Sequence, residues 1–280
     1  MPKTLKSFRE DALRRAPQVS PSDLDFVLTE RLKLTPSEYQ LHFDQVLSPD
    51  IEVQFKKDLK KLVRGVSPQY IVGYAWFYGY RIKVQSGVLI PRFETEELVQ
   101  WASSTVQSGH TILDLGTGSG AITVALAKKA IENGKSELTF FASDITDQAL
   151  RMAEENFLDY HLDVYIRKAN VLIGLEKFDL IVSNPPYIKL SEKSLMDENV
   201  LRNEPKEALF GGEDGLDFYR QFADQVRDHL NPGGKFFLEF GFREENELKK
   251  LFQKKLPDFD LEFRKDMAGK PRIVCGRWQK

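Results

Sequence analysis

The sequence predicts an α/β fold in which a parallel sheet follows a small helical domain. From Thr111 onward, short apolar segments alternate with segments of helical periodicity. Alternation at this spacing is typical of a parallel sheet with helices on both faces. Before residue 75, apolar residues instead recur at spacings of three, four and seven, which indicates amphipathic helices. The two patterns together predict two domains of different architecture.

The helical domain is expected to span residues 1–75 and to contain four or five helices. Two of them should begin at residues 20–23 (SPSD) and 35–38 (TPSE), where a hydroxyl residue, a proline and an early acid form a helix start. Residues 74–90 then change to aromatic and β-branched residues with glycine turns, which favours a β-hairpin.

We assign residues 76–92 to a β-hairpin linker and residues 93–280 to the α/β domain. Three helices are expected in that domain, at residues 121–131, 148–158 and 218–230. Seven strands are expected around them, at residues 111–115, 138–143, 164–167, 178–183, 235–240, 261–264 and 272–277.

Composition excludes several classes of protein. No apolar run approaches the roughly 18 residues of a membrane span, and the N-terminus lacks the apolar region of a secretory signal. A single cysteine, Cys275, rules out a disulfide framework, so a reducing, cytoplasmic location is expected. The four histidines show no paired spacing, so we expect no metal site and no histidine-based triad. The net charge of −2 predicts no general attraction to nucleic acid.

The most informative motif is Asn-Pro-Pro-Tyr at residues 184–187, directly after the expected strand at 178–183. Two prolines end the ladder of hydrogen bonds and leave polar groups at the carboxyl end of the strand, where α/β sheets bind ligands. The Asn184 side-chain oxygen and the Pro185 carbonyl can each accept one N–H, and Tyr187 can lie over a flat π-system. This corner, with Pro186, therefore suits a planar NH2 group; a proline-stiffened turn is the alternative.

A glycine-rich loop joins the first expected strand of the α/β domain to its helix. Alternate glycines let the backbone pass close to a ligand at a helix N-terminus. The pattern is G-x-G-x-G, unlike a dinucleotide fingerprint, and no Arg or Lys is near to hold a pyrophosphate. The acid before the loop suits an ammonium or sulfonium group instead. We assign to cofactor binding, with a generic tight turn as the alternative, Asp114, Gly116, Thr117, Gly118, Ser119 and Gly120.

The next two strands end in further candidate ligand groups. Asp144 follows the second strand and is placed to accept hydrogen bonds from two ribose hydroxyls, with a helix N-cap as the alternative. Val171 lies in the loop after the third strand, where an adenine edge could be read. Together the loops predict a site for an adenosine that bears a positive sulfur, beside a corner that holds an NH2 group. That combination indicates S-adenosyl-L-methionine and a nitrogen acceptor, with no metal.

At this point the sequence resembles the HemK/PrmC family of protein-glutamine methyltransferases over nearly its whole length. Beyond the glycine loop and the Asn-Pro-Pro-Tyr motif, the resemblance rests on residues 69–73 (QYIVG), 88–96 (VLIPRFETE), 204–205 (EP), 208–209 (AL), 211–212 (GG) and 215–216 (GL), and on Asp266, Gly269 and Arg272. The family usually has proline where this chain has Phe93, and often an aromatic residue where it has Val171.

The resemblance implies a class I S-adenosylmethionine-dependent methyltransferase fold, Rossmann-like with a seven-stranded sheet, behind a helical N-terminal domain. It implies methylation of the side-chain amide of the glutamine in the Gly-Gly-Gln motif of class I peptide release factors, with S-adenosyl-L-homocysteine as the second product. It carries cofactor contacts onto residues 116–120, Asp144, Val171 and Asn184, and substrate contacts onto Asn184, Pro185, Pro186 and Tyr187. Asn184, Pro185 and Tyr187 are the expected catalytic residues, acting by orientation rather than as a general base.

Two other functions remain open from the sequence. An N6-adenine DNA or RNA methyltransferase uses the same corner on an exocyclic amine, but the near-neutral charge and the absence of a basic domain disfavour it. A non-catalytic adaptor could bind the release factor through its helical domain, but the intact glycine loop argues against that. We expect a monomer that recognises release factors through residues 1–75 and forms no stable complex with nucleic acid or membrane.

Overall fold

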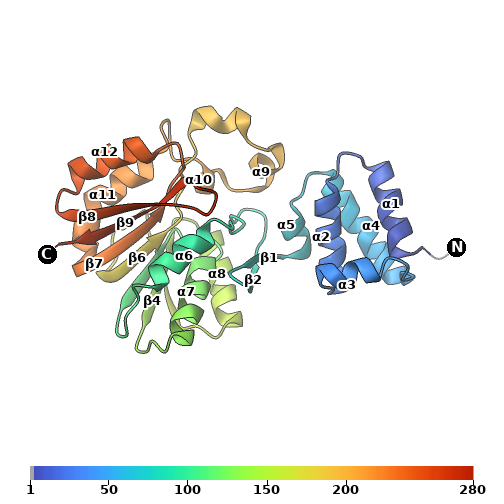
Figure 1. Ribbon diagram of the computed structural model, residues 1–280, viewed down its shortest axis with the longest axis horizontal. Coiled ribbons are helices and arrows are strands. Elements are labelled where there is room, and N and C mark those ends of the chain that lie inside the picture. The colour runs from blue at the N-terminus through green and yellow to red at the C-terminus, as the bar shows by residue number, and fades with distance from the viewer. Residues whose placement is uncertain (1–2, 280) are drawn as a thin grey trace. The chain divides into compact units, whose positions relative to one another are not determined.

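The computed structural model describes residues 3–279 and divides into two compact units (Figure 1). The helical unit contains the chain up to Tyr74 together with Asp197–Asn203, and the sheet unit contains Ala75–Met196 and the chain from Glu204 onward. No helix among the described residues combines the length and the apolar character needed to cross a membrane.

Among its described residues, the helical unit contains five helices in its first segment and one short helix in its second. They are α1 (Leu5–Arg15), α2 (Pro21–Leu32), α3 (Pro36–Leu41), α4 (Pro49–Val63), α5 (Pro68–Val72) and α9 (Glu198–Asn203). Both predicted helix starts are confirmed. Ser20 is the N-cap of α2, and Thr35 closes a capping box on α3 in which its hydroxyl accepts from the Glu38 N–H and Glu38 accepts from the Thr35 N–H.

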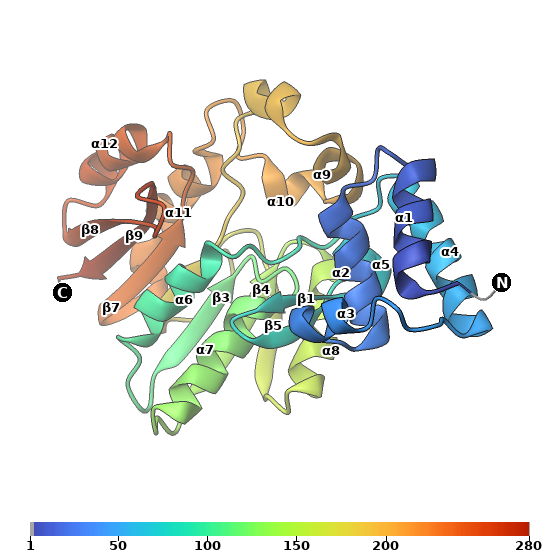
Figure 2. The ribbon, with the colours of Figure 1, turned by 45° about the vertical axis from the view of Figure 1, so that its right-hand side comes forward.

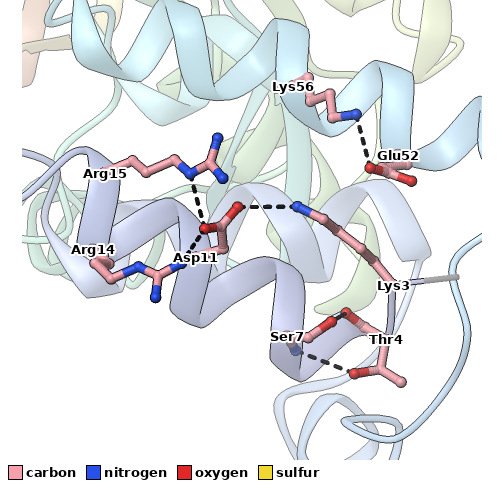
Figure 3. A network of polar contacts seen from close by, with 8 residues as sticks. All are labelled: Lys3, Thr4, Ser7, Asp11, Arg14, Arg15, Glu52 and Lys56. Carbon is pink, nitrogen blue, oxygen red and sulfur yellow. Dashed lines mark hydrogen bonds and ion pairs between the residues drawn. The ribbon is translucent and has the colours of Figure 1, made fainter. Parts of the chain in front are cut away.

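A cluster of charged side chains surrounds Asp11 in the helical unit. Asp11 of α1 accepts hydrogen bonds from Lys3 at 3.0 Å, Arg14 at 2.6 Å and Arg15 at 2.9 Å (Figure 3). The hydrogen bond from Lys3, followed by that from Arg14, lowers the pKa of Asp11 below its usual value. Because the Arg14 and Arg15 side chains are 77% and 72% exposed, their pairs with Asp11 add little to stability individually.

A more deeply placed ion pair joins three helices. Asp58 of α4 is 1% exposed and accepts from Arg31 Nε of α2 at 2.9 Å and from Gln54 Nε2 at 2.9 Å. Arg31 also donates to the Ile71 carbonyl of α5 at 2.7 Å. Removal of one partner from such a pair leaves the other charge with less compensation in a poorly solvated place.

The segment α9 belongs to the helical unit although it lies far along the chain, between the Asn-Pro-Pro-Tyr corner and Glu204. Asn203 Nδ2 donates to the Gly65 carbonyl at 2.6 Å, and Arg202 donates to the Arg64 carbonyl at 3.2 Å. The chain thus leaves the sheet unit after Met196 and returns to it at Glu204.

Within residues 75–196 and 204–279, the sheet unit is built on a sheet of seven strands in the order β5-β4-β3-β6-β7-β9-β8. The strands are β3 (Thr111–Leu115), β4 (Thr139–Asp144), β5 (Val164–Lys168), β6 (Phe178–Ser183), β7 (Leu230–Glu239), β8 (Phe259–Lys265) and β9 (Pro271–Trp278). The predicted seven-stranded α/β fold is confirmed. The predicted parallel sheet is mostly confirmed, but at one edge β9 runs antiparallel to β7 and β8. Residues 266–270 are too few for the crossover that a parallel pair requires.

Helices cover both faces of the sheet, as predicted, and Figures 1 and 2 show both layers. One buried cluster contains residues of α6 (Thr95–Ser103), α7 (Ala121–Glu132) and α8 (Asp147–Asp159), and the other contains residues of α11 (Asp217–His229) and α12 (Glu245–Lys255). The hairpin of β1 (Tyr74–Phe77) and β2 (Tyr80–Lys83) supplies Phe77 and Ile82 to the first cluster, so it packs into the core of the sheet unit.

Two short helices, η1 (Leu190–Leu195, a 3-10 helix) and α10 (Lys206–Leu209), complete the elements of the sheet unit. Cys275 is half-buried and packs against the first cluster, and burial raises the pKa of its thiol to about 12. A thiol with this pKa is almost wholly protonated near neutrality and is a poor nucleophile.

We expect Asp58→Ala to destabilise the helical unit by about 2–3 kcal/mol. This is less than the roughly 3–5 kcal/mol of a fully buried pair, because the Arg31 side chain is 30% exposed. All three tryptophans (Trp76, Trp101 and Trp278) lie in the sheet unit. In urea, far-UV circular dichroism should therefore show an earlier transition while tryptophan fluorescence keeps its midpoint.

Asp44→Ala is the matched control for this measurement, because Asp44 is exposed and lies outside any helix of the unit. Equal circular-dichroism midpoints for the two variants would contradict the assigned role of Asp58.

Candidate active site

A cavity of about 330 Å³ lies at the carboxyl ends of the central parallel strands of the sheet unit. Nine of the twelve predicted site residues line it: Gly116, Thr117, Gly118, Ser119, Asp144, Val171, Asn184, Pro185 and Pro186. The three others, Asp114, Gly120 and Tyr187, are not among its lining residues. The structure therefore brings together residues at the ends of four strands, β3, β4, β5 and β6. It also separates the residues that contact the cavity from those that lie behind its wall.

The glycine loop takes its shape from left-handed backbone conformations. Gly116, Gly118 and Gly120 have φ values of 71°, 56° and 80°, which side chains disfavour. At Gly118 a Cβ would meet no heavy atom within 4 Å, whereas at Gly120 it would lie 2.6 Å from Phe157 of α8. Gly120 thus allows α7 and α8 to approach each other, and the other two glycines form the cavity wall.

Asp114, predicted to face a positive ligand, lies buried beneath the loop. Its Oδ2 accepts from the Thr117 hydroxyl at 2.7 Å, from the Thr123 hydroxyl at 2.8 Å and from the Thr123 N–H at 3.2 Å. Burial raises its pKa to about 6, and these hydrogen bonds oppose that shift. In the structure this carboxyl group ties the glycine loop to the first turn of α7.

Asp144 connects the glycine loop to the start of α8. Its Oδ2 accepts from the Gly118 N–H at 3.1 Å, and its Oδ1 accepts from the N–H and the hydroxyl of Thr146 at 2.9 and 3.0 Å. Thr146 is the N-cap of α8, so the alternative interpretation of Asp144 as that cap is wrong. Each carboxylate oxygen has capacity for further donors, and the side chain lines the cavity.

Val171 lies on the cavity wall in a conformation that is rare for its type. Its φ is 52°, in the left-handed region that a β-branched residue seldom adopts. Such strain occurs where the surrounding structure imposes it, often at ligand sites. The side chain is buried, so it presents an apolar surface to the cavity.

The Asn-Pro-Pro-Tyr corner is anchored to a buried carboxylate. Asn184 Nδ2 donates to the Thr95 hydroxyl oxygen at 2.9 Å, and the Thr95 hydroxyl donates to Glu239 Oε2 at 2.6 Å. The Tyr187 hydroxyl donates to Glu239 Oε1 at 3.1 Å. Burial, and then the nearby Glu239, raise the pKa of Tyr187, so its hydroxyl stays protonated.

A glycine-containing loop supports the backbone of the same corner. Ile188 and Phe210 form a parallel bridge, in which the Ile188 N–H donates to Leu209 and the Gly211 N–H donates to Ile188, both at 3.0 Å. A Cβ at Gly211 would lie 2.7 Å from the Pro186 carbonyl, and one at Gly215 would lie 2.4 Å from the Tyr187 carbonyl. Only glycine permits this close approach.

Comparison with known proteins decides the family. Residues 8–73 match the family model described as PrmC N-terminal domain, and residues 86–213 match the model described as Methyltransferase small domain. The release factor glutamine methyltransferase of Streptococcus pneumoniae is 37% identical over 96% of this chain and 95% of its own length, and that of Lactococcus lactis is 38% identical over 91% and 93%. This chain belongs to the release factor glutamine methyltransferase family. The predicted resemblance is confirmed.

Solved structures of other methyltransferases show that the family shares a wider fold. A methyltransferase from Pyrococcus furiosus has a TM-score of 0.54 at 21% identity and covers 72% of this chain and 90% of its own. The 16S rRNA N2 G1207 methyltransferase of T. thermophilus, in complex with AdoMet and guanosine, has a TM-score of 0.51 at 18% identity and covers 73% and 49%.

Two pairs of segments on which the resemblance rests are joined by ion pairs. Arg92 forms an ion pair with Glu204, which is buried, and Arg272 Nε donates to Asp266 Oδ2 at 3.2 Å. Arg92 lines the cavity, and so does Pro205, the residue after Glu204. Phe93, where the family usually has proline, is 65% exposed and is not among the lining residues.

Sequence reasoning missed Thr95 and Glu239 as parts of the site. Thr95 lies within the segment at residues 88–96 that carried the resemblance, but nothing local gave it a partner. Glu239 had one signal, because it is a single acid in the apolar run FFLEF at residues 236–240. A charged residue inside a central strand is buried only when it is paired or hydrogen-bonded.

We expect Gly120→Ala to destabilise the sheet unit by about 2–4 kcal/mol. About 1–2 kcal/mol comes from the left-handed backbone and the rest from overpacking against Phe157. Gly134→Ala is the control, since Gly134 also has a positive φ, of 70°, but a Cβ there would meet nothing within 4 Å. Urea unfolding followed by tryptophan fluorescence should separate the two variants, and equal losses would contradict a packing role for Gly120.

Proposed function

We propose that this chain transfers a methyl group from S-adenosyl-L-methionine to the side-chain amide nitrogen of the glutamine in the Gly-Gly-Gln motif of class I peptide release factors. Relatives named release factor glutamine methyltransferase match 90% or more of the chain, across both units. The observation that carries the proposal is that one cavity is lined both by the glycine loop and by Asn184 and Pro185. A methyl donor on the loop would lie beside an amide held at the corner.

The residues of the cavity fit S-adenosyl-L-methionine. Its volume of about 330 Å³ falls within the usual range of small-molecule sites. The backbone of residues 116–119 would accommodate the amino-acid end, the Asp144 carboxylate would accept the ribose hydroxyls, and Val171 would contact the adenine. When bound, the cofactor supplies a methyl group on a positive sulfur, which is an electrophile.

Orientation is the main chemical task of the corner. An amide nitrogen is a weak nucleophile because its lone pair is delocalised into the carbonyl. Asn184 Oδ1 and the Pro185 carbonyl would accept its two hydrogens and direct the nitrogen toward the methyl group. The Tyr187 ring would pack against the flat amide, and the surplus proton would pass to water. Positioning of this kind contributes several kcal/mol, roughly as in oriented intramolecular reactions.

We further propose that the helical unit recognises the release factor, that the chain acts as a monomer in the cytoplasm, and that it forms no stable complex with nucleic acid. Residues 1–90 contain 14 Lys and Arg and 10 Asp and Glu, whereas the whole chain has a net charge of −2. This local excess of positive charge supports a binding role for the N-terminal part of the chain.

Labelled cofactor offered with release factor or with nucleic acid tests which of the two is the substrate. Mass spectrometry should find one added methyl group on the Gly-Gly-Gln glutamine and none on the nucleic acid.

Asp144→Ala should weaken cofactor binding about 10- to 100-fold while single-turnover methyl transfer at saturating cofactor changes much less. The carboxylate would hold the ribose equally in the ground and transition states, and hydrogen bonds to a charged group contribute about 1.5–3 kcal/mol. Calorimetric titration measures the affinity. Asp147→Ala is the control, because Asp147 is exposed, pairs with Lys168 and does not line the cavity. Normal affinity in Asp144→Ala would remove this residue from the cofactor site.

Asn184→Ala should lower the single-turnover rate about 10²–10³-fold at saturating cofactor. Removing one preorganised hydrogen-bonding group from the reacting centre typically costs about 2.7–4 kcal/mol of transition-state stabilisation. Asn133→Ala, at the exposed end of α7, is the matched control. A folded Asn184→Ala protein with the parental rate would show that the motif is only a stiff turn.

A further inference from the structure

A buried carboxylate lies behind the proposed catalytic corner and has no assigned role. Glu239, the last residue of β7, is 1% exposed. Its two oxygens accept separately, Oε2 from the Thr95 hydroxyl at 2.6 Å and Oε1 from the Tyr187 hydroxyl at 3.1 Å. Two residues that lie far apart in the sequence therefore meet at one desolvated group.

The hydrogen-bond directions in this network follow from the donors available. An ionised carboxylate only accepts, and a threonine hydroxyl has one proton to donate. Because Thr95 gives that proton to Glu239, its oxygen can only accept from Asn184. The opposite arrangement would place two oxygens 2.6 Å apart with no proton between them.

The same directions fix the orientation of the Asn184 amide. The orientation of an asparagine amide is set by its hydrogen-bond partners. Its NH2 group must face Thr95, at 2.9 Å, so its Oδ1 is turned away from that hydroxyl. This leaves an acceptor, and not a donor, at the corner that lines the cavity.

We propose that Glu239 and Thr95 are positioning residues that hold Asn184 with its side-chain oxygen presented to the N–H of the substrate amide. The inference rests on the proposed function, since it explains how the corner selects and orients an NH2 group. Without the pair, the Asn184 amide could rotate and present its own NH2 to the substrate, donor against donor.

The groups around Glu239 determine how readily its carboxyl group ionises. Arg272 faces it and favours its charged form, Glu94 disfavours that form, and the Thr95 and Tyr187 hydroxyls stabilise it. Tyr219 is also packed there and donates to the Glu239 main-chain carbonyl at 2.6 Å. Burial is the largest influence and raises the pKa of Glu239. Methyl transfer should therefore be fully active above this pKa and should decline as the pH falls through it, because a protonated Glu239 can donate to Thr95.

Thr95→Val tests the inference, because it keeps the side-chain shape and removes the hydroxyl. We expect single-turnover methyl transfer to fall about 10²-fold, with cofactor affinity within twofold of the parent. Thr95→Ser should restore most of the rate, because serine supplies the same acceptor and donor. Thr105→Val removes a hydroxyl that lies just after α6, donates to the Ala102 carbonyl and is outside this network, so this variant should keep the parental rate. A parental rate in Thr95→Val would overturn the inference while leaving the proposed function standing.

Glu239→Gln supplies the second arm, since it removes the group that titrates. The pH profile of its kcat should lose the decline at low pH that the parent shows, and retention of that decline in a folded variant would overturn the role of Glu239.

A third measurement needs no turnover. It follows the side-chain 15NH2 signal of Asn184 in the cofactor-free protein, which is assigned by its absence in Asn184→Asp. This signal should shift in Thr95→Val and stay unchanged in Thr105→Val. An unshifted signal in Thr95→Val would overturn the inference, whether or not the parent protein methylates release factor. A parent protein that failed to methylate release factor would instead count against the proposed function alone.

Discussion

The parallel pairing of β3 with β4 on one side and β6 on the other is the constraint on which the site depends. The register pairs Leu115 with Ser143 and Asp114 with Val182, so the three strands end at the same edge of the sheet. The glycine loop and the Asn-Pro-Pro-Tyr corner follow β3 and β6 directly, and Asp144 is the last residue of β4. Since β4 and β5 extend to one side of β3 and β6 and β7 to the other, the loops diverge and leave a crevice between them.

Buried carboxyl groups then fix the loops that the strands bring together. Asp114 receives three hydrogen bonds from Thr117 and Thr123, within ten residues of itself, and so shapes a local turn. Glu239 receives hydrogen bonds from Thr95 and Tyr187, which come from distant parts of the chain. Burial raises the pKa of both groups, and the hydrogen bonds oppose it. Each buried carboxyl group thus needs its hydrogen-bond donors to offset the cost of burial. This requirement fixes the positions of the donor residues.

Local patterns were sufficient to predict much of the fold. Alternating strand and helix periods gave the seven strands and the helices on both faces, because each period is a property of a short segment. The direction of β9 was missed although residues 266–270 leave no room for a crossover. The inclusion of α9 in the helical unit had no signal, since its contacts are made by Arg202 and Asn203 to main-chain carbonyls.

In the candidate site too, local motifs predicted some features, whereas others depend on tertiary contacts. Motifs predicted which loops surround the cavity, and they placed nine residues on its wall. They could not show that Asp114 and Gly120 act behind the wall, because a side chain's direction depends on strand pleat and helix packing. The partnership of Thr95 with Glu239 spans 144 residues, and no local spacing encodes such a contact.

The support of the Asn-Pro-Pro-Tyr corner shows why a side chain from a distant part of the sequence matters there. Pro185 and Pro186 restrict the backbone through their rings, and the loop containing Gly211 and Gly215 packs against the carbonyls that follow. With the backbone held on both sides, the main freedom left at the corner is rotation of the Asn184 amide. Rotation by half a turn would exchange an acceptor for a donor at nearly the same position. A single hydrogen bond to Thr95, which also lines the cavity, removes that freedom, so the chemical identity of the corner depends on this contact.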